Sequence, residues 1–384
     1  MDSAPRKIAL VHDWLAVYTG SERVFEQIIQ LYPQADLFSL VEFLPASQRA
    51  FLQGKPVQTS ILQRLPFARA HFRAYLPLMP LAIEQFDLSG YDLVISSSHA
   101  VAKGVITGPN QLHISYIHSP IRYAWDMQHE YLRDSRLRRG LKSWLARAML
   151  HYIRLWDART VNSVDALAAN SNFIARRIWK VYRRQARVIY PPVDVRQFAF
   201  SPQKDDTYLA VSRLVPYKKM DLIVKAFAGL PDRRLVVIGD GPERARIERM
   251  AGANITFMGY QPDSTIVSAM QRAKAFVFAA QEDFGITPLE AQACGTPVIA
   301  YGDGGVTETV RGLDHPQPTG VFFSEQTPEA LRAAVVQFEA NADRILPQAC
   351  SANAARFASE NFRAAFSAFV TEEWDAFLRR WRCD

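Results

Sequence analysis

Residues 281–310 read QEDFGITPLEAQACGTPVIAYGDGGVTETV, and this stretch decides the fold. Asp283–Gly285 is typical of a turn. Thr287 offers a capping hydroxyl and Pro288 suits the first helical position, so the pair predicts a helix start. Cys294–Pro297 ends that helix, and residues 298–300 form the short apolar run of a buried parallel strand. The stretch therefore predicts a turn, a helix and a strand in succession.

A ligand site is predicted at the start of this helix. A helix N-terminus collects unpaired N–H groups and the positive end of a dipole, and both favour a phosphate or a sugar hydroxyl. Glu282 and Glu290 flank this position, and Gly302, Gly304 and Gly305 loosen the backbone that follows the strand. The two glutamates are therefore the first candidate binding residues.

Length and composition indicate more than one domain. The 384 residues are 49% hydrophobic, which is enough for a large core but exceeds what one domain usually holds. Cys294, Cys350 and Cys383 are widely spaced and outside any metal-ligand pattern, so neither a disulfide framework nor a zinc site is expected and a reducing cytoplasm is favoured. The sequence lacks a signal-peptide pattern and an apolar run of spanning length, which predicts a soluble protein.

Short apolar runs alternate with helical stretches along both halves of the chain. The double proline Pro191-Pro192 forbids a helix and favours an extended linker, so we place a domain boundary near Val195. Alternating strands and helices predict an α/β protein with a mainly parallel sheet in each half. The expected strands are residues 7–13, 91–98, 112–120 and 167–171 in the first half, and 208–211, 235–238, 255–258, 275–278 and 298–300 in the second.

Two features of the first half lie where an α/β domain binds ligands. The first strand runs into a loop that ends at Gly20, and Ser21 then opens a helix, as in a phosphate-binding turn without the full dinucleotide fingerprint. An ordinary strand-to-helix turn explains the same pattern. His118 lies where the third strand should end, and in open parallel sheets ligands bind beyond the carboxyl ends of the strands, although a lone histidine is more often structural. His12, His99 and His113 are interpreted as structural.

The segment 133–159 is basic and rich in apolar residues at helical spacing. Its apolar positions recur every three or four residues, which predicts a helix with one apolar face flanked by basic residues. Such a helix suits an anionic lipid surface, and the net charge of +7 favours anionic partners in general. A helix that packs its apolar face on its own sheet would look the same.

Cations follow the first strand of the second half. Arg213 and Lys218 lie between that strand and the next helix, where two cations five residues apart could clamp a diphosphate. Solvated surface cations are the alternative. Gly239 lies in a further strand-to-glycine turn, where backbone could approach a base or ribose, although many such turns bind nothing.

These motifs carry a resemblance that covers nearly the whole chain. SRLVPYKKMDLIVKAF (212–227), VIGDGPE (237–243), FMGY (257–260) and EDFGITPLEAQACGTPVIA (282–300) resemble the retaining glycosyltransferases of family 4, which have two facing Rossmann-like domains, the GT-B fold. The spacing of Glu282 and Glu290 is that family's best-known motif. VHDWL (11–15) and ISYIHSPIRYAWD (114–126) are similar to bacterial mannosyltransferases of O-antigen and exopolysaccharide assembly.

The resemblance implies roles for these residues. Arg213 and Lys218 would hold the donor diphosphate and stabilise it as it leaves. Glu290 would bind the ribose, Glu282 would orient the donor sugar, and His118 would reach that sugar from the other domain. The implied catalytic residues are His118, Glu282, Arg213 and Lys218, and the implied donor-binding residues are Gly20, Ser21, Arg213, Lys218, Gly239, Met258, Asp283, Phe284, Gly285, Ile286, Thr287 and Glu290. Ser21 and Lys219 depart from the glycines common in the family.

The resemblance also implies an organisation and an activity. Residues 1–195 would form the acceptor domain, 196–360 the nucleotide-sugar domain, and 361–384 a helix that crosses back to the first domain. The expected enzyme is a cytoplasmic, peripherally membrane-bound transferase that moves a hexose, mannose from GDP-mannose first, to a lipid-linked saccharide. No metal ion is expected, because no Asp-x-Asp pair ends a strand. No other cofactor is expected, and the intact clamp and glutamates argue against a nucleic-acid partner. A UDP- or dTDP-sugar transferase, a nucleotide-sugar epimerase of the same fold and a silent nucleotide- or nucleic-acid-binding module are the alternatives.

Overall fold

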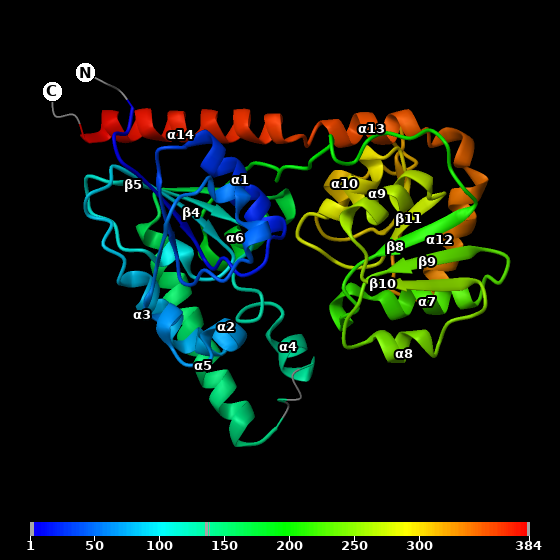
Figure 1. Ribbon diagram of the computed structural model, residues 1–384, viewed down its shortest axis with the longest axis horizontal. Coiled ribbons are helices and arrows are strands. Elements are labelled where there is room, and N and C mark those ends of the chain that lie inside the picture. Colours follow the sequence, from blue (N-terminus) through cyan, green and yellow to red (C-terminus); the bar gives the residue numbers. More distant parts are fainter. Residues whose placement is uncertain (1–3, 135–136, 138, 382–384) are drawn as a thin grey trace. The chain divides into compact units, whose positions relative to one another are not determined.

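The computed structural model describes residues 4–134, 137 and 139–381, and the chain forms two compact units (Figure 1). The first unit comprises Met1–Pro192 together with Phe362–Asp384, and the second comprises Val193–Asn361. The sequence placed these boundaries at 195/196 and 360/361. Cys383 lies outside the described residues.

The first unit is built on a parallel sheet. Within its described residues, seven strands pair in the order β3-β2-β1-β4-β5-β6-β7. The strands are β1 Ile8–His12, β2 Asp36–Ser39, β3 Val57–Thr59, β4 Leu93–Ser98, β5 Leu112–Ile117, β6 Ala166–Ala169 and β7 Arg187–Val188. The α-helices are α1 Gly20–Leu31, α2 Ala68–His71, α3 Met79–Glu84, α4 Gln128–Asp134, α5 Leu141–Thr160, α6 Asn172–Tyr182 and α14 Ser359–Trp381. Every residue of β1, β4 and β5 is buried, as expected for strands covered on both faces.

The second unit repeats this plan. Its described strands are all parallel and pair in the order β10-β9-β8-β11-β12-β13. They are β8 Thr207–Val211, β9 Arg234–Ile238, β10 Ile255–Gly259, β11 Ala275–Phe278, β12 Val298–Tyr301 and β13 Gly320–Phe323. The α-helices are α7 Met220–Ala228, α8 Arg244–Glu248, α9 Asp263–Arg272, α10 Ile286–Ala293, α11 Val306–Thr309, α12 Pro328–Ala340 and α13 Pro347–Ala355. Both sheets therefore have the α/β architecture that the sequence predicted.

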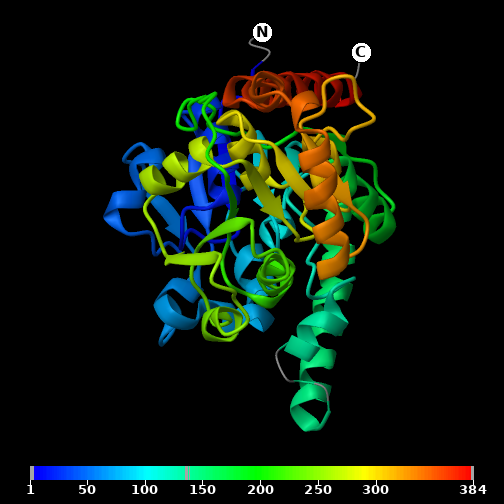
Figure 2. The ribbon, with the colours of Figure 1, turned by 90° about the vertical axis from the view of Figure 1, so that its right-hand side faces the viewer.

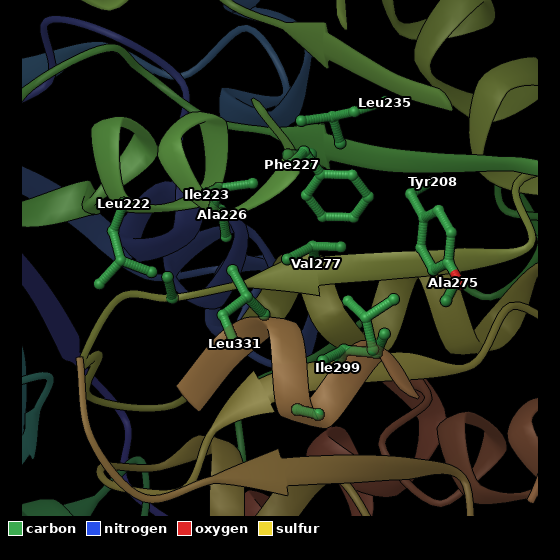
Figure 3. Packing of buried hydrophobic residues seen from close by; sticks show 14 of the residues in the cluster. Tyr208, Leu222, Ile223, Ala226, Phe227, Leu235, Ala275, Val277, Ile299 and Leu331 are labelled. Atoms are coloured by element: carbon green, nitrogen blue, oxygen red, sulfur yellow. The ribbon is translucent and has the colours of Figure 1, made fainter. Parts of the chain in front are cut away.

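One face of the second sheet packs against α7 and α12. Phe227 of α7 and Leu331 of α12 are fully buried against the strands, and the ring of Tyr208 lies beside Phe227 with ring centroids 5.1 Å apart (Figure 3). Val277 and Ile299 supply the strand side of the same core. The central strands β8, β11 and β12 are thus fixed firmly, and the loops that leave their carboxyl ends start from rigid elements.

The aromatic C-terminal helix belongs largely to the core of the first unit. From Phe362 onward α14 lies along this unit (Figures 1 and 2), where Phe362, Phe366 and Phe369 are buried. The rings of Tyr116 and Phe362 pack edge to face with centroids 5.9 Å apart. The first unit is therefore assembled from both ends of the chain.

Two local predictions were wrong. Helix α10 begins at Ile286, one residue before Thr287, because Gly285 adopts a left-handed conformation with φ of 91° at the N-cap position. Thr287 therefore lies inside the first turn and does not cap it. The segment 133–159 is not one helix with one apolar face, and parts of it (135, 136 and 138) lie outside the described residues.

Candidate active site

The predicted donor residues of the second unit gather where β8, β11 and β12 end. The strand order turns between β8 and β11, and in open parallel sheets the loops beyond such a turning point form the ligand crevice. Residues 212–218 leave β8, residues 279–285 leave β11, and residues 302–305 leave β12. Rigid neighbouring strands thereby bring chemistry from distant parts of the sequence together.

Lys218 and Glu282 form an ion pair at this edge. Nζ of Lys218 donates a hydrogen bond to Oε1 of Glu282, and each side chain is about one-fifth exposed. Lys218 ends the short 3-10 helix η7, Pro216–Lys218, and Glu282 lies in the loop that follows β11. The carboxylate thus holds the ammonium group of Lys218 in place while both remain accessible to a ligand.

Gly304 and Gly305 explain the position of Glu282. A Cβ atom on Gly304 would lie 2.5 Å from the carbonyl oxygen of Glu282, and one on Gly305 would lie 2.2 Å from that of Asp283. The N–H of Gly305 donates to the Glu282 carbonyl at 2.8 Å. The loop after β12 therefore presses directly on the turn after β11, and only glycine permits this approach.

Arg213 is the exposed member of the predicted clamp. Its side chain has no hydrogen bond or ion pair with the residues that the structure describes. Gly239 packs against the backbone of Ser212, the residue before Arg213. A Cβ atom on Gly239 would lie 1.9 Å from the carbonyl oxygen of Ser212. The glycine in this turn is thus explained by close packing between two loops. Lys219 adopts a left-handed conformation with φ of 54°, which explains why glycine suits that position.

The remaining donor candidates of the second unit differ in accessibility. Ile286 and Thr287 are partly exposed in the first turn of α10, whereas Glu290 is buried with 7% exposure. The ring of Phe284 is buried against Phe357, so only its backbone could meet a ligand. Met258 lies apart: it lines a cavity of about 480 Å³ beside α9, and the cavity walls include none of the other predicted donor residues.

In the first unit, His118 directly follows β5. Its Nε2 lies 2.8 Å from Oγ of Ser97 on the neighbouring strand β4, and its carbonyl oxygen accepts a hydrogen bond from Asn170. Burial, together with the nearby His99 and His12, lowers the pKa of His118 to about 3. The imidazole is therefore neutral at physiological pH.

Gly20 and Ser21 form the first turn of α1, which begins at Gly20 and is capped by Thr19. The hydroxyl of Ser21 donates to Oε2 of the buried Glu22 at 3.0 Å. Glu22 also accepts from the backbone N–H and the hydroxyl of Thr19, which completes a capping box. The serine is thus compatible with a tight turn where the family often has a second glycine.

Several polar groups of this site were missed in the sequence. His12, which was interpreted as structural, is fully buried and contacts both Ser97 and Glu22, two contacts that the sequence did not predict. Asp13 accepts hydrogen bonds from four consecutive backbone N–H groups, those of residues 99–102. A Thr-x-x-Glu capping box was a readable signal for Glu22, but nothing in the sequence indicated that these groups meet.

The structure thus places the predicted residues in two groups, one in each unit. Arg213, Lys218 and the loops around Glu282 and Glu290 gather in the second unit, and Gly20, Ser21 and His118 lie in the first. Among residues 4–134, 137 and 139–381, no cluster of three or more His, Cys, Asp or Glu side chains could hold a metal ion. In the same residues, no helix is long and apolar enough to span a membrane.

Comparison with known proteins identifies the family. Residues 19–197 match the family model described as "Glycosyltransferase Family 4", and residues 194–357 match "Glycosyl transferases group 1". The D-inositol 3-phosphate glycosyltransferase of Mycolicibacterium paratuberculosis is 29% identical over 254 residues, which cover 56% of each chain. A Corynebacterium glutamicum enzyme, GDP-mannose-dependent monoacylated alpha-(1-6)-phosphatidylinositol monomannoside mannosyltransferase, is 32% identical over 178 residues, or 38% of this chain and 47% of that one. The chain spans about half the length of the curated relatives it matches.

Solved structures agree on the architecture. The Anabaena protein HepE in complex with UDP has a TM-score of 0.67 at 18% identity, with 95% of this chain and 100% of that chain covered. The sucrose-phosphate synthase of Thermosynechococcus elongatus has a TM-score of 0.72 at 19% identity, with 96% and 99% covered. Likeness at this identity establishes the fold. Since the two family models together cover almost the whole chain, this protein belongs to glycosyltransferase family 4 and has the GT-B fold.

Proposed function

We propose that this protein is a retaining, metal-independent hexosyltransferase that moves mannose from GDP-mannose to a lipid-linked saccharide. The observation that carries the proposal is the largely buried Lys218–Glu282 pair, with the exposed Arg213 in the same loop as Lys218, after strand β8 of the second sheet. A leaving nucleoside diphosphate needs positive charge where its own charge develops, and preorganised cations supply it. In this proposal Lys218 and Arg213 supply that charge, and Glu282 keeps Lys218 oriented until the donor binds.

The proposal of GDP-mannose as the donor is supported by the name of one relative. The Corynebacterium glutamicum enzyme is named for its dependence on GDP-mannose, whereas HepE was solved with UDP. The donor base is therefore the first property to measure. A ligand present at about 100 times its dissociation constant stabilises a protein by about 2.7 kcal/mol, which is readily seen in thermal unfolding.

The donor experiment compares thermal stability with GDP, UDP, dTDP and ADP, each with and without EDTA. We expect GDP to raise the melting temperature most and EDTA to leave that shift unchanged. A shift with UDP or dTDP instead would replace mannose by another hexose donor. A shift that EDTA abolishes would contradict metal independence, and no shift with any nucleotide would overturn the proposed donor site.

Alanine substitutions test the clamp in a transfer assay. Lys218→Ala and Glu282→Ala should each lower turnover by about a hundredfold or more, as loss of one preorganised charged group does in other enzymes. Lys225→Ala is the matched control, because Lys225 also pairs with a carboxylate, that of Asp221, but on the helix α7. Near-normal turnover in both clamp variants would contradict the site. Release of free epimerised sugar without an acceptor would instead indicate an epimerase.

The proposed lipid-linked acceptor is supported by the solvent face of α5. Leu141, Trp144, Leu145, Tyr152 and Leu155 are between 45% and 74% exposed and fall on one stripe of the helix. A different set of apolar residues, which includes Leu150, Ile153 and Trp156, faces inward and is buried. The N-terminal half of α5 also projects from its unit (Figures 1 and 2).

This stripe suits the interface of a membrane. A contiguous exposed apolar patch marks a binding surface, and the exposed Arg139, Lys142 and Arg159 beside it suit anionic headgroups. The prediction of a single apolar face for residues 133–159 was wrong, because α5 buries one apolar stripe and exposes another. We propose that the exposed stripe rests on the anionic membrane that carries the acceptor.

Vesicle sedimentation tests this surface. We expect the protein to bind vesicles of equimolar phosphatidylglycerol and phosphatidylcholine, and Trp144→Glu with Leu145→Glu to weaken binding by more than tenfold, since each buried side chain contributes about 1.5 to 3 kcal/mol. Val336→Glu is the control, because Val336 is similarly exposed but lies on α12. Equal binding by the double variant and the control would contradict the surface.

A further inference from the structure

A chain of hydrogen bonds links a carboxylate to His118 through the buried interior of the first unit. Nε2 of His12 lies 3.4 Å from Oε1 of Glu22, and Nδ1 of His12 lies 3.1 Å from Oγ of Ser97. The same Ser97 oxygen lies 2.8 Å from Nε2 of His118. Four side chains on α1, β1, β4 and the end of β5 thus form one continuous path.

The path is rigid. Glu22, His12 and Ser97 are buried, and the His12 ring stacks on Phe25 with centroids 4.8 Å apart. His12 and Ser97 occupy paired positions of neighbouring parallel strands. Because both ring nitrogens of His12 and the hydroxyl of Ser97 have fixed neighbours, the direction of each hydrogen bond is determined by the one before it.

The carboxylate of Glu22 sets the starting direction. Burial by itself would raise the pKa of Glu22, but hydrogen bonds and charge from His12 and a hydrogen bond from Thr19 outweigh burial and lower it to about 2. The ionised carboxylate can only accept, so Nε2 of His12 carries a hydrogen and donates. When the His12 ring carries only this one hydrogen, its Nδ1 accepts from the Ser97 hydroxyl.

The last link determines the state of His118. The Ser97 hydroxyl donates its single hydrogen to His12, so the Ser97 oxygen can only accept from Nε2–H of His118. Nδ1 of the neutral His118 is left without a hydrogen. Among the described residues, Nδ1 has no hydrogen-bond partner, and His118 is partly exposed.

We propose that Glu22, His12 and Ser97 are positioning residues that hold His118 in the Nε2–H tautomer, so that its Nδ1 accepts a hydrogen bond from a hydroxyl of the donor sugar. The tautomer follows from the geometry of the free protein, whereas its use toward a sugar rests on the proposed function. In this proposal, the chain of hydrogen bonds makes Nδ1 of His118 a hydrogen-bond acceptor that orients the donor sugar.

Glu22→Gln provides the sharpest test, because it should reverse the whole chain. The backbone N–H of Thr19 donates to Oε2 of Glu22 at 3.0 Å, so the amide oxygen of a glutamine must take that place. The amide NH₂ then faces Nε2 of His12 and donates to it. His12 would carry its hydrogen on Nδ1 and donate to Ser97, and the Ser97 hydroxyl would donate to Nε2 of His118. The hydrogen of His118 would move to Nδ1.

Nitrogen NMR shows directly which ring nitrogen of His118 carries the hydrogen. Long-range ¹H–¹⁵N spectra of the purified, ligand-free protein, recorded at about pH 8.5, two units above the ordinary pKa of histidine, distinguish the two tautomers. We expect Nε2–H on His118 in the wild type and Nδ1–H in Glu22→Gln. Ser97→Ala should leave His118 in a mixture of both, and adding Glu22→Gln to it should change nothing further.

Two matched controls lie close by. Glu26→Gln changes the same charge one turn further along α1, where the carboxylate accepts from Tyr18 and has no link to His118. Ser96→Ala removes the neighbouring buried hydroxyl of β4, which bonds His113 at 2.9 Å. Neither should alter the His118 signals. Nδ1–H on wild-type His118, or no change in folded Glu22→Gln, would overturn the proposal; if that variant fails to fold, an unaltered His118 tautomer in Ser97→Ala would do so.

The kinetic readout separates the two proposals. In Glu22→Gln, kcat should fall about tenfold, equivalent to one lost hydrogen bond, with a smaller change in KM. If His118 has the expected tautomers but the wild type transfers no sugar, the proposed function is overturned and the chain of hydrogen bonds from Glu22 to His118 still stands. Transfer with unchanged kcat in a variant whose tautomer has reversed would overturn the acceptor role of His118.

Discussion

Asp13 is fully buried at the end of β1, where its carboxylate accepts four backbone N–H groups at 2.6 to 3.0 Å. In Asp13→Asn the amide NH₂ would face donors and leave some of them unpaired. We expect a loss of about 2 to 3 kcal/mol in the free energy of unfolding, the cost of buried unsatisfied groups. Urea denaturation measures it. Asp87→Asn, at an exposed aspartate, is the control. If Asp13→Asn lowered the free energy of unfolding as little as Asp87→Asn does, this role of Asp13 would be contradicted.

The pH dependence of that loss has a definite sign. Burial would raise the pKa of Asp13, but His99, His12 and the backbone N–H groups outweigh burial and lower the pKa below its ordinary 3.8. A carboxylate whose folded pKa is lowered stabilises the fold above the unfolded pKa and loses that effect as the pH falls through the folded value. The stability difference between wild type and Asp13→Asn should therefore be constant above about pH 5 and shrink below pH 4. A difference that grows on acidification would contradict the shift.

At the scale of single residues, the sequence revealed only part of the site. Lys218 and Glu282 could be proposed from the sequence because each follows a recognisable strand within a specific motif. His12, Ser97 and His118 were not linked in advance, because residues separated by 85 and 21 positions meet only through the strand order of the sheet. A short sequence pattern carries no information on such contacts.

At the scale of elements, a buried ion pair fastens α5 to its unit. Lys103, in the 3-10 helix η5 (Ala102–Gly104), donates to Asp157 of α5, and both side chains are buried. Trp125 and Tyr182 also donate to the Asp157 carboxylate, at 2.7 and 2.9 Å. Lys103→Met would leave this carboxylate uncompensated, and we expect a loss of about 3 to 5 kcal/mol.

Tryptophan fluorescence is the suitable probe for this loss. All seven tryptophans lie in the residues of the first unit, so their emission reports its unfolding in urea. Lys180→Met, on the exposed side of α6, is the control. The double variant Lys103→Met with Asp157→Leu should recover most of the lost stability, because it removes the buried charge as well as its partner. A single variant as stable as the control would contradict the role of the pair.

The strands were predictable because parallel strands buried on both faces are continuous apolar runs. The details of the helices were not. The start of α10 depends on the left-handed conformation of Gly285, which overrides the capping signal of Thr287. The inner and outer stripes of α5 are both apolar, so periodicity in the sequence could not separate Ile153, which is buried, from Trp144, which is exposed.

At the scale of the whole molecule, the first unit depends on the end of the chain. Phe362, Phe366, Phe369 and Val370 of α14 are buried in the same core as β1, β4 and β5. The resemblance to the GT-B fold predicted a helix over residues 361–384 that crosses back to the first domain. The second unit, by contrast, is one continuous segment of the chain.

This difference predicts how fragments behave. Burial of four apolar side chains stabilises the first unit by roughly 6 to 12 kcal/mol at 1.5 to 3 kcal/mol each, which is comparable to the whole net stability of a domain. Residues 1–192 alone should therefore lose fixed tertiary packing, whereas residues 193–361 should fold and unfold cooperatively. Near-ultraviolet circular dichroism and binding of a hydrophobic dye measure both.

A peptide of residues 359–381 should restore the packing of the fragment 1–192 when added in excess. A chain that ends at Glu373 keeps the four buried side chains and should stay folded, so it controls for truncation as such. A fragment 1–192 as stable as the first unit of the intact chain would contradict the dependence on α14. Rescue by the peptide would show that the first unit is completed by α14, which follows the second unit in the sequence.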